Sequence, residues 1–287
     1  MGNKLYIIGN GFDLHHNLRT SYANFRDDYL KKKHLSLWEK LLDIYGDAPK
    51  QDFWWKDFEN MLGNIDYAHL TALRNGEALG ASRAKNFLKW NLRTFFGDWI
   101  KVVESNQDYR KIKLMDEIEK EALFFTFNYT LLLEKAYHVE ERQVWHIHES
   151  IKNADKIVVG HDSDYASLFS SYINYIKKNP NAQIRPDILD GIIQDVSSAA
   201  KKVKDKIYIN EVKLKFNEYS EIKHFVVMGF SFNDIDLPYI KKICDVNKSL
   251  EDADWTLYWH GEGEEEMMKN KLIGLGVSDN NITTLRW

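Results

Sequence analysis

The stretch Lys4-Leu5-Tyr6-Ile7-Ile8-Gly9-Asn10-Gly11-Phe12-Asp13 places a short apolar run directly before a turn with two glycines. Such a run, followed by a glycine turn and a helix, is typical of the first strand of a parallel α/β sheet. Because glycine lacks a Cβ, this kind of turn can bring its backbone N–H groups close to a phosphate. The stretch predicts a nucleotide site, or alternatively an ordinary strand-to-helix turn, since Leu14 replaces the third glycine of G-x-G-x-x-G.

Five further apolar runs have the length and composition of buried strands, and Gly, Asn or Asp turn signals bound each of them. They lie at residues 122–127, 156–159, 224–228, 255–259 and 282–285. Helical patterns at Pro238–Val246 and Glu264–Leu275 separate the later runs. This alternation predicts an α/β fold with a doubly wound, Rossmann-like parallel sheet core.

Two long intervals between the predicted strands have helical periodicity instead. They cover approximately residues 22–120 and 162–222, and Thr20-Ser21 can cap a helix that begins at Tyr22. No repeat or linker separates these intervals from the rest. We therefore expect a single domain over residues 1–287 that carries two large helical insertions.

Composition narrows the class of protein. Hydrophobic residues make up 44% of the 287 residues, enough for a sizeable core, and the formal net charge of -4 provides no general field for nucleic acid. No apolar run approaches the length of a membrane span, and the start lacks a signal-peptide pattern. The single cysteine, Cys244, lies in an apolar pattern that predicts burial. We expect a cytoplasmic protein that binds neither membrane nor nucleic acid directly.

A second and a third cluster of polar residues lie further along the chain, after the first cluster at Gly9 to Asp13. Asn128 comes directly after the run at 122–127, and its amide can hold a ribose hydroxyl or a water; alternatively it caps a helix at 129–131. His146 and His148 stand two residues apart on an extended segment and so share one face. One or both can act as a base or ligand, or both can be structural imidazoles with satisfied hydrogen bonds.

A fourth cluster follows the run at 224–228, where Gly229 begins another turn. Ser231 and Asp234 can reach a ribose or adenine edge, or Asp234 or Asn233 can simply cap the helix that begins near Leu237 and Pro238. Because open parallel sheets bind ligands at the carboxyl ends of their strands, we expect these clusters to meet at one edge.

Taken together, Gly9 to Asp13, Phe127-Asn128-Tyr129, His146-Ile147-His148 and Gly229 to Asp234 resemble the AbiH family of bacterial phage-defence proteins. That family is part of the wider SIR2-like group, whose core is a Rossmann-type NAD-binding fold. The resemblance extends from Lys4 to beyond Asp236. It implies a protein of abortive infection that handles NAD.

The resemblance also implies roles for individual residues. Asn128 would contact the nicotinamide ribose and His148 would be the catalytic base. Glu149 stands where the SIR2-like pattern has glycine, and Thr130 where it has aspartate. The residues expected to bind the cofactor are Gly9, Asn10, Gly11, Phe12, Asp13, His146, Gly229, Phe230, Ser231 and Asp234.

The predicted reaction is hydrolysis of NAD to ADP-ribose and nicotinamide without a metal, in a pocket to which Phe12, Phe127 and Tyr129 could contribute aromatic rings. One alternative is a module that senses NAD or an ADP-ribose derivative without cleaving it. Another is a metal-dependent phosphoesterase with ligands among Asp13, His146, His148, His161, Asp162 and His260. The expected partners are a small-molecule nucleotide and either a second copy of the chain or another defence protein.

Overall fold

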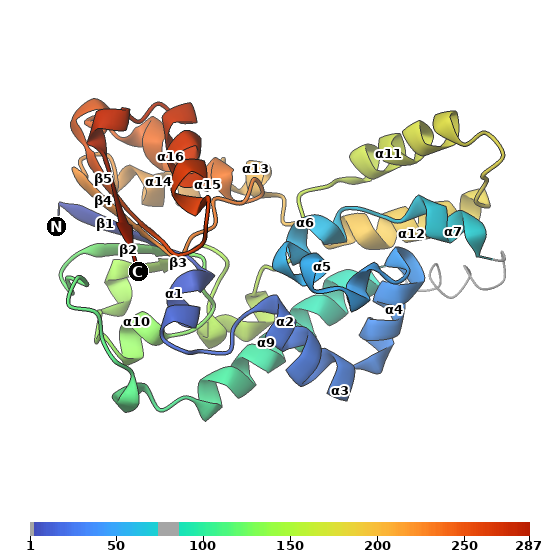
Figure 1. Cartoon of the computed structure of the whole chain (residues 1–287), viewed down its shortest axis with the longest axis horizontal. Helices are drawn as coiled ribbons and strands as arrows, with labels where there is room; N and C mark the ends of the chain where they lie inside the picture. Colours follow the sequence, from blue (N-terminus) through green and yellow to red (C-terminus); the bar gives the residue numbers. More distant parts are fainter. Residues whose placement is uncertain (1–2, 74–85) are drawn as a thin grey trace. The chain divides into compact units, whose positions relative to one another are not determined.

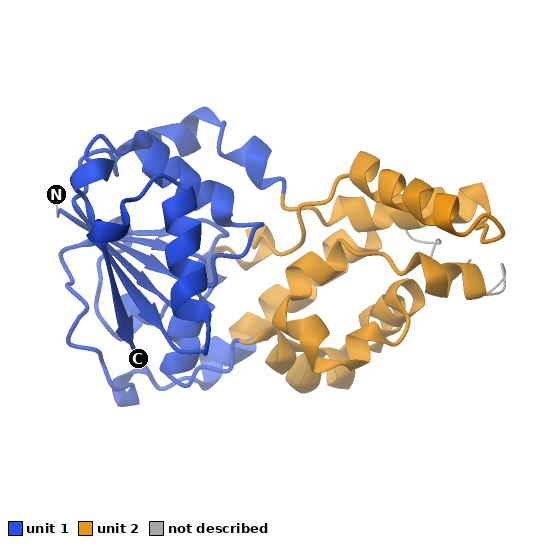
Figure 2. Ribbon diagram, turned by 45° about the horizontal axis from the view of Figure 1, so that its top comes forward, with its two compact units in different colours: residues 1–20, 102–152, 202–287 blue, residues 21–101, 153–201 orange. Residues whose placement is uncertain are grey.

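The computed structural model describes residues 3–73 and 86–287. The chain divides into two compact units (Figure 2). Unit 1 comprises Met1–Thr20, Val102–Lys152 and Lys202–Trp287, and unit 2 comprises Ser21–Lys101 and Asn153–Lys201. The chain therefore leaves unit 1 for unit 2 twice and returns each time.

Unit 1 is built on a six-stranded parallel sheet (Figure 1). Its strands are β1 (Lys4–Ile8), β2 (Leu123–Thr126), β3 (Val144–His146), β4 (His224–Met228), β5 (Asp254–Trp259) and β6 (Ile282–Arg286). Their spatial order is β3-β2-β1-β4-β5-β6. This is the Rossmann order, in which the direction of winding reverses between β1 and β4, and open sheets of this kind bind ligands at the carboxyl ends of the strands beside that point. The predicted α/β class with a parallel, Rossmann-like core is confirmed.

The side chains of β1 enter two separate cores, because successive residues of a strand point to opposite faces. Leu5 and Ile7 belong to one core, whereas Tyr6 and Ile8 belong to the other. The first core includes residues of α13 (Val203–Lys206), α14 (Asn210–Asn217), α15 (Leu237–Val246) and α16 (Glu264–Gly274). The second includes residues of α1 (Asn10–His15) and α10 (Leu132–Lys135). Helices thus cover both faces of the sheet, and Cys244 is buried among them as predicted.

One predicted strand is wrong. Residues 156–159 form no strand, and they belong to unit 2. Ile157 and Val159 are buried there, so the apolar run signals burial without strand pairing. The third strand in chain order is instead β3, whose residues are only partly buried.

Unit 2 is helical. It contains α2 (Tyr22–Asn24), a π-helical turn (Phe25–Leu30), α3 (Lys31–Lys33), α4 (Leu35–Tyr45), α5 (Asp52–Lys56), α6 (Phe58–Leu62), α7 (Tyr67–Ala72), α11 (Tyr165–Lys178), α12 (Pro186–Ser198) and most of α9 (Phe87–Asn106). The helix predicted to begin at Tyr22 does so, because Ser21 accepts a hydrogen bond from the Asn24 N–H at 3.1 Å. Short 3₁₀ turns lie at Ala48–Lys50, Tyr109–Lys111, Glu141–Gln143, Ile151–Lys156, Leu250–Asp252 and Asp279–Asn281.

Large aromatic side chains fill the interior of unit 2. The Trp55 and Phe58 rings are stacked with centroids 4.9 Å apart, and both rings are buried. Phe25 and Trp99 meet at 5.3 Å in the same unit. Within residues 3–73 and 86–287, no helix combines the length and the apolar content that a membrane crossing needs.

Candidate functional site

The carboxyl ends of four neighbouring strands lie side by side in unit 1. Thr126 is the register partner of both Ile8 and His146, and Ile8 is also paired with Met228. The residues that follow continue the ladder, since the Phe127 N–H donates to the Ile8 carbonyl at 2.9 Å. All four predicted clusters therefore begin at one edge of the sheet.

The two glycine turns at this edge pack directly on each other. The Gly11 N–H donates to the Gly229 carbonyl at 2.9 Å. A Cβ on Gly9 would lie 2.4 Å from the Gly229 oxygen, and a Cβ on Gly229 would lie 2.1 Å from the Phe12 nitrogen. Gly229 also has φ +63°, a conformation that favours glycine. This contact between backbones explains the glycines without a ligand, so their phosphate-binding role stays a prediction.

The other side chains of the first turn have separate partners. The Asn10 amide donates to the Thr20 carbonyl at 3.1 Å, which ties the turn to the loop that follows α1. Phe12 of α1 is buried in the core that also includes residues of α10, and its ring centroid lies 5.8 Å from that of Tyr137. Phe127 lies in the opposite core, so the structure separates these two members of the expected aromatic pocket.

Asp13 points inward and holds two polar side chains from the segment after β2. One carboxylate oxygen accepts a hydrogen bond from Asn128 Nδ2 at 2.8 Å, and the other accepts one from Thr130 Oγ1 at 2.8 Å. Asp13 is 1% exposed and Asn128 is 5% exposed. The other amide atom, Asn128 Oδ1, is also buried, and no described residue donates a hydrogen bond to it. Asn128 does not cap a helix, because α10 begins at Leu132.

Burial raises the pKa of Asp13 to about 7, although its hydrogen bonds to Thr130 and Asn128 act in the opposite direction. The carboxylate of Glu104 adds to the rise, and His146 reduces it. Desolvation dominates because a buried carboxylate loses its hydration shell. Asp13 therefore changes charge near neutral pH.

This raised pKa predicts how stability depends on pH. Between about pH 4 and pH 7 the native state keeps a proton on Asp13 that the unfolded chain has lost, so stability falls as pH rises through this window. A shift from 3.8 to about 7 corresponds to roughly 4 kcal/mol at most. Urea unfolding between pH 4.5 and 8 should show this decline in the wild type but not in Asp13→Asn. Parallel stability curves for the two proteins would contradict the assignment.

His146 supports the backbone rather than facing a ligand. Its Nδ1 donates to the Asn128 carbonyl oxygen at 2.8 Å, and its Nε2 lies 3.1 Å from Glu134 Oε1. Both ring nitrogens thus lie within hydrogen-bonding distance of protein oxygen atoms. The imidazole ties the segment after β2 to α10 and so fixes the position of Asn128.

His148 is held by a carboxylate that the sequence did not single out. Its Nε2 lies 2.9 Å from Asp236 Oδ1, and the ring is 2% exposed. A carboxylate accepts a hydrogen bond from Nε2–H, so the neutral ring keeps its proton on Nε2 and carries its lone pair on Nδ1. The ring centroids of Phe127 and Tyr239 lie 5.6 and 5.7 Å away. This is a histidine–carboxylate pair in aromatic surroundings, an arrangement suited to a general base.

Glu149 keeps the backbone conformation that a glycine would adopt. Its φ is +64°, in the left-handed region that L residues rarely occupy. The resemblance places glycine at this position, so Glu149 differs from that pattern in its side chain while its φ is one that favours glycine.

Asp236 is the functional residue that the sequence analysis missed. It directly precedes the helix α15, which could have drawn attention to it, but no spacing rule connects it to His148.

The remaining predicted residues are divided between the interior and the surface. Phe230 stacks on Phe127 with centroids 4.4 Å apart, which places the fourth cluster beside the aromatic surroundings of His148. Ser231 is exposed. Asp234 forms an ion pair with Lys271 of α16, and it does not cap α15, whose N-cap is Asp236. A role for Asp234 in adenosine binding stays a prediction.

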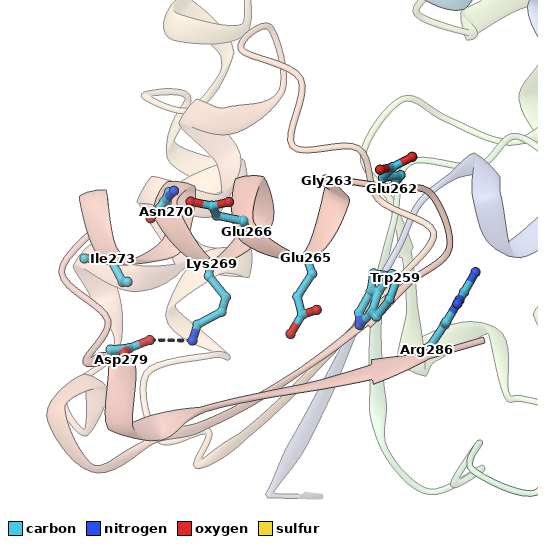
Figure 3. A pocket seen from close by; sticks show the side chains of 10 residues that line it. All are labelled: Trp259, Glu262, Gly263, Glu265, Glu266, Lys269, Asn270, Ile273, Asp279 and Arg286. Atoms are coloured by element: carbon cyan, nitrogen blue, oxygen red, sulfur yellow. Dashed lines mark ion pairs between the residues drawn. The ribbon is translucent and has the colours of Figure 1, made fainter.

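A separate hollow of about 790 Å³ lies beside α16 and the last two strands (Figure 3). Trp259 and Arg286, the last residues of β5 and β6, stand at one end of it, and the Arg286 guanidinium lies 5.2 Å from the Trp259 ring centroid. Lys269 and Asp279 form an ion pair at the other end. None of the residues predicted from the sequence to bind a nucleotide lines this hollow.

The candidate metal ligands do not form a metal-binding group. Among the described residues, no three His, Cys, Asp or Glu side chains are arranged to hold an ion. His161 belongs to unit 2, where its Nε2 lies 2.8 Å from the Val196 carbonyl oxygen and its Nδ1 accepts from the Ser163 N–H at 3.0 Å. Asp13 and His146 are engaged as described above.

Comparison with known proteins gives a family match. The model of a family described as "Bacteriophage abortive infection AbiH" matches residues 5–87 and 76–259. No curated protein and no solved structure matches significantly. The matched ranges include β1 from Leu5 onward, β2 to β5 and every residue of the four clusters.

Proposed function

From the premise that the chain belongs to the bacteriophage abortive infection family AbiH, we propose that it serves this role by hydrolysing NAD to ADP-ribose and nicotinamide. The observation that carries the proposal is the presence of two features at the ends of the neighbouring strands β2 and β3. Asn128 presents a buried carbonyl that lacks a donor among the described residues, and His148 is held by a carboxylate. They follow β2 and β3, the two strands that lie beyond β1 on one side of the switch point, and Rossmann folds bind dinucleotides at the carboxyl ends of these strands.

The proposed reaction requires few catalytic groups. The bond between C1′ of the ribose and the pyridinium nitrogen breaks with its electron pair going to that nitrogen, so nicotinamide leaves neutral and needs no general acid. Water forms the new bond to C1′ and gives up a proton. His148 accepts that proton, and Asn128 Oδ1 accepts a hydrogen bond from a ribose hydroxyl.

The surroundings of His148 fit this chemistry. Phe127, Tyr129 and Tyr239 place their rings within 6.4 Å of the imidazole, measured between centroids. Aromatic walls exclude bulk water and strengthen electrostatic interactions with an oxocarbenium-like ribose. Asp236 orients the imidazole and stabilises its protonated form.

The burial of His148 favours one alternative, a module that binds NAD or an ADP-ribose derivative without turnover. A base that is 2% exposed needs an opening motion or a substrate-filled site to react. Incubation with NAD, followed by measurement of nicotinamide, separates the two functions. Release of nicotinamide supports hydrolysis, whereas binding by calorimetry without release supports sensing.

Asp236→Asn tests the histidine–carboxylate pair. We expect nicotinamide release to fall about 10²-fold, because an amide neither fixes the imidazole tautomer nor stabilises its charge. The matched control is Asp245→Asn on the same helix, where the carboxylate is exposed and pairs with Lys241. The control should retain the wild-type rate. An Asp236→Asn protein with the wild-type rate would show that the pair has no part in catalysis.

A further inference from the structure

Asp13 and Asn128 form a buried pair in which each group restricts the other. The carboxylate is 1% exposed, and both of its oxygens accept hydrogen bonds from the protein. Above its pKa of about 7 this carboxylate is ionised, and an ionised carboxylate only accepts hydrogen bonds. The amide branch of Asn128 that faces Asp13 must therefore be the NH₂ group, and the carbonyl branch must point away from it.

The consequence of this restriction is one unsatisfied acceptor. Asn128 Oδ1 is buried, and no donor within residues 3–73 or 86–287 reaches it. A buried carbonyl without a donor is costly, so native proteins leave one where a ligand or water supplies the hydrogen. His146 and Thr126 fix the backbone of Asn128, through its carbonyl at 2.8 Å and its N–H at 3.1 Å. The amide therefore has little freedom to turn.

We propose that Asp13 is a positioning residue that locks the Asn128 amide with its carbonyl directed to the ligand, so that this subsite accepts a hydrogen-bond donor such as a ribose hydroxyl. Asp13 acts through Asn128 and touches no ligand itself. This role differs from the direct contact with the cofactor that the sequence predicted for Asp13. Thr130 holds the second carboxylate oxygen and keeps Asp13 in this orientation. The inference rests on the proposed function for the identity of the ligand, but the lock is a property of the chain.

An aspartate at position 13 suits this role better than an asparagine, because the two side chains differ in their hydrogen-bonding groups. An asparagine at position 13 would offer both a donor and an acceptor, so the Asn128 amide could turn and present its NH₂ group to the ligand instead. A ribose hydroxyl would then meet a donor where it needs an acceptor. The ionised carboxylate has no donor, so the Asn128 amide can face it only with its NH₂ group. Burial strengthens this preference, because a buried polar group without a hydrogen-bond partner is costly.

A double-substitution cycle tests the lock through activity at pH 8, above the pKa of about 7. Asp13→Asn should lower kcat/KM for NAD about 10- to 100-fold, the range for loss of a hydrogen bond to a charged group. In an Asn128→Ala background the same change should have almost no further effect, because Asp13 then has no amide to orient. Asp245→Asn serves as the control for a lost charge. Independent, multiplicative effects of the two substitutions would overturn the proposal.

A second readout does not depend on activity. The side-chain NH₂ signals of Asn128 are assigned in ¹⁵N-labelled full-length protein by their loss in Asn128→Ala. Their exchange with solvent should be about 10- to 100-fold faster in Asp13→Asn than in the wild type, because the bond to the carboxylate is gone. Unchanged exchange would overturn the lock even if the protein cleaves NAD. If the wild type neither cleaves nor binds NAD, the proposed function fails while this measurement still decides the lock.

Thr130→Val provides an independent variant should Asp13→Asn fold poorly. It removes one hydrogen bond from Asp13 and leaves the carboxylate in place. We expect exchange of the Asn128 amide to become several-fold faster, since the carboxylate is less well held. Exchange at the wild-type rate in Thr130→Val would contradict the role given to Thr130 and to the network.

Discussion

Replacing His148 by alanine is expected to lower nicotinamide release from NAD by about 10²–10⁴-fold, the usual contribution of a positioned general base. The imidazole is the group placed to take the proton of the attacking water, and Asp236 holds it at 2.9 Å. Water can still attack the oxocarbenium-like ribose slowly, so a residual rate should remain. NAD affinity should change much less than the rate, because the histidine acts mainly in the transition state.

The matched control for this variant is His224→Ala. His224 lies at the amino end of β4, is half exposed, and pairs with Asp254 at 3.4 Å. Its removal takes away an imidazole of the same unit without touching the carboxyl edge of the sheet. A His148→Ala protein that releases nicotinamide as fast as the His224→Ala protein would eliminate His148 as the base.

Gly229→Ala is expected to have the largest effect on stability. The new Cβ would lie 2.1 Å from the Phe12 nitrogen and 2.5 Å from the Gly11 carbonyl carbon, and backbone atoms cannot move aside as a flexible side chain can. The positive φ adds a conformational cost of about 1–2 kcal/mol. We expect a loss of more than about 4 kcal/mol, which is enough to unfold many domains. Chemical unfolding monitored by tryptophan fluorescence measures this loss.

Gly263→Ala separates the two causes. Gly263 also has a positive φ, +78°, but a Cβ there would meet nothing within 4 Å. This variant should lose only the conformational cost, about 1–2 kcal/mol. Equal losses for Gly229→Ala and Gly263→Ala would show that the close contact between the two glycine turns is unimportant.

The strands at the centre of the sheet could be predicted because they are apolar on both faces. β1 and β4 have both faces covered by helices, so their sequences are continuous apolar runs that end at glycines. The same rule failed at residues 156–159, where Ile157 and Val159 are buried without pairing in a sheet. It also did not identify β3, an edge strand with partly buried residues. Apolar runs report burial, and pairing must be established separately.

The candidate site could be located from the sequence more readily than its contacts. The rule that ligands bind at the carboxyl ends of parallel strands correctly brought Asn128 and His148 to the ends of neighbouring strands. The partner of each was not foreseen. Asp13 was expected to face a ligand, yet it turns inward to Asn128, and Asp236 reaches His148 across 88 positions of sequence. Side-chain direction at a turn depends on tertiary packing, which one sequence does not encode in any simple spacing.

The central claim is that a dinucleotide occupies the edge of the sheet beside Asn128 and His148. The most direct test is a crystal structure of the protein with a non-hydrolysable NAD analogue. We predict a ribose hydroxyl within hydrogen-bonding distance of Asn128 Oδ1 and the anomeric carbon facing the His148 ring. An analogue bound instead in the hollow beside Trp259 and Arg286, with the edge of β2 and β3 empty, would contradict the account.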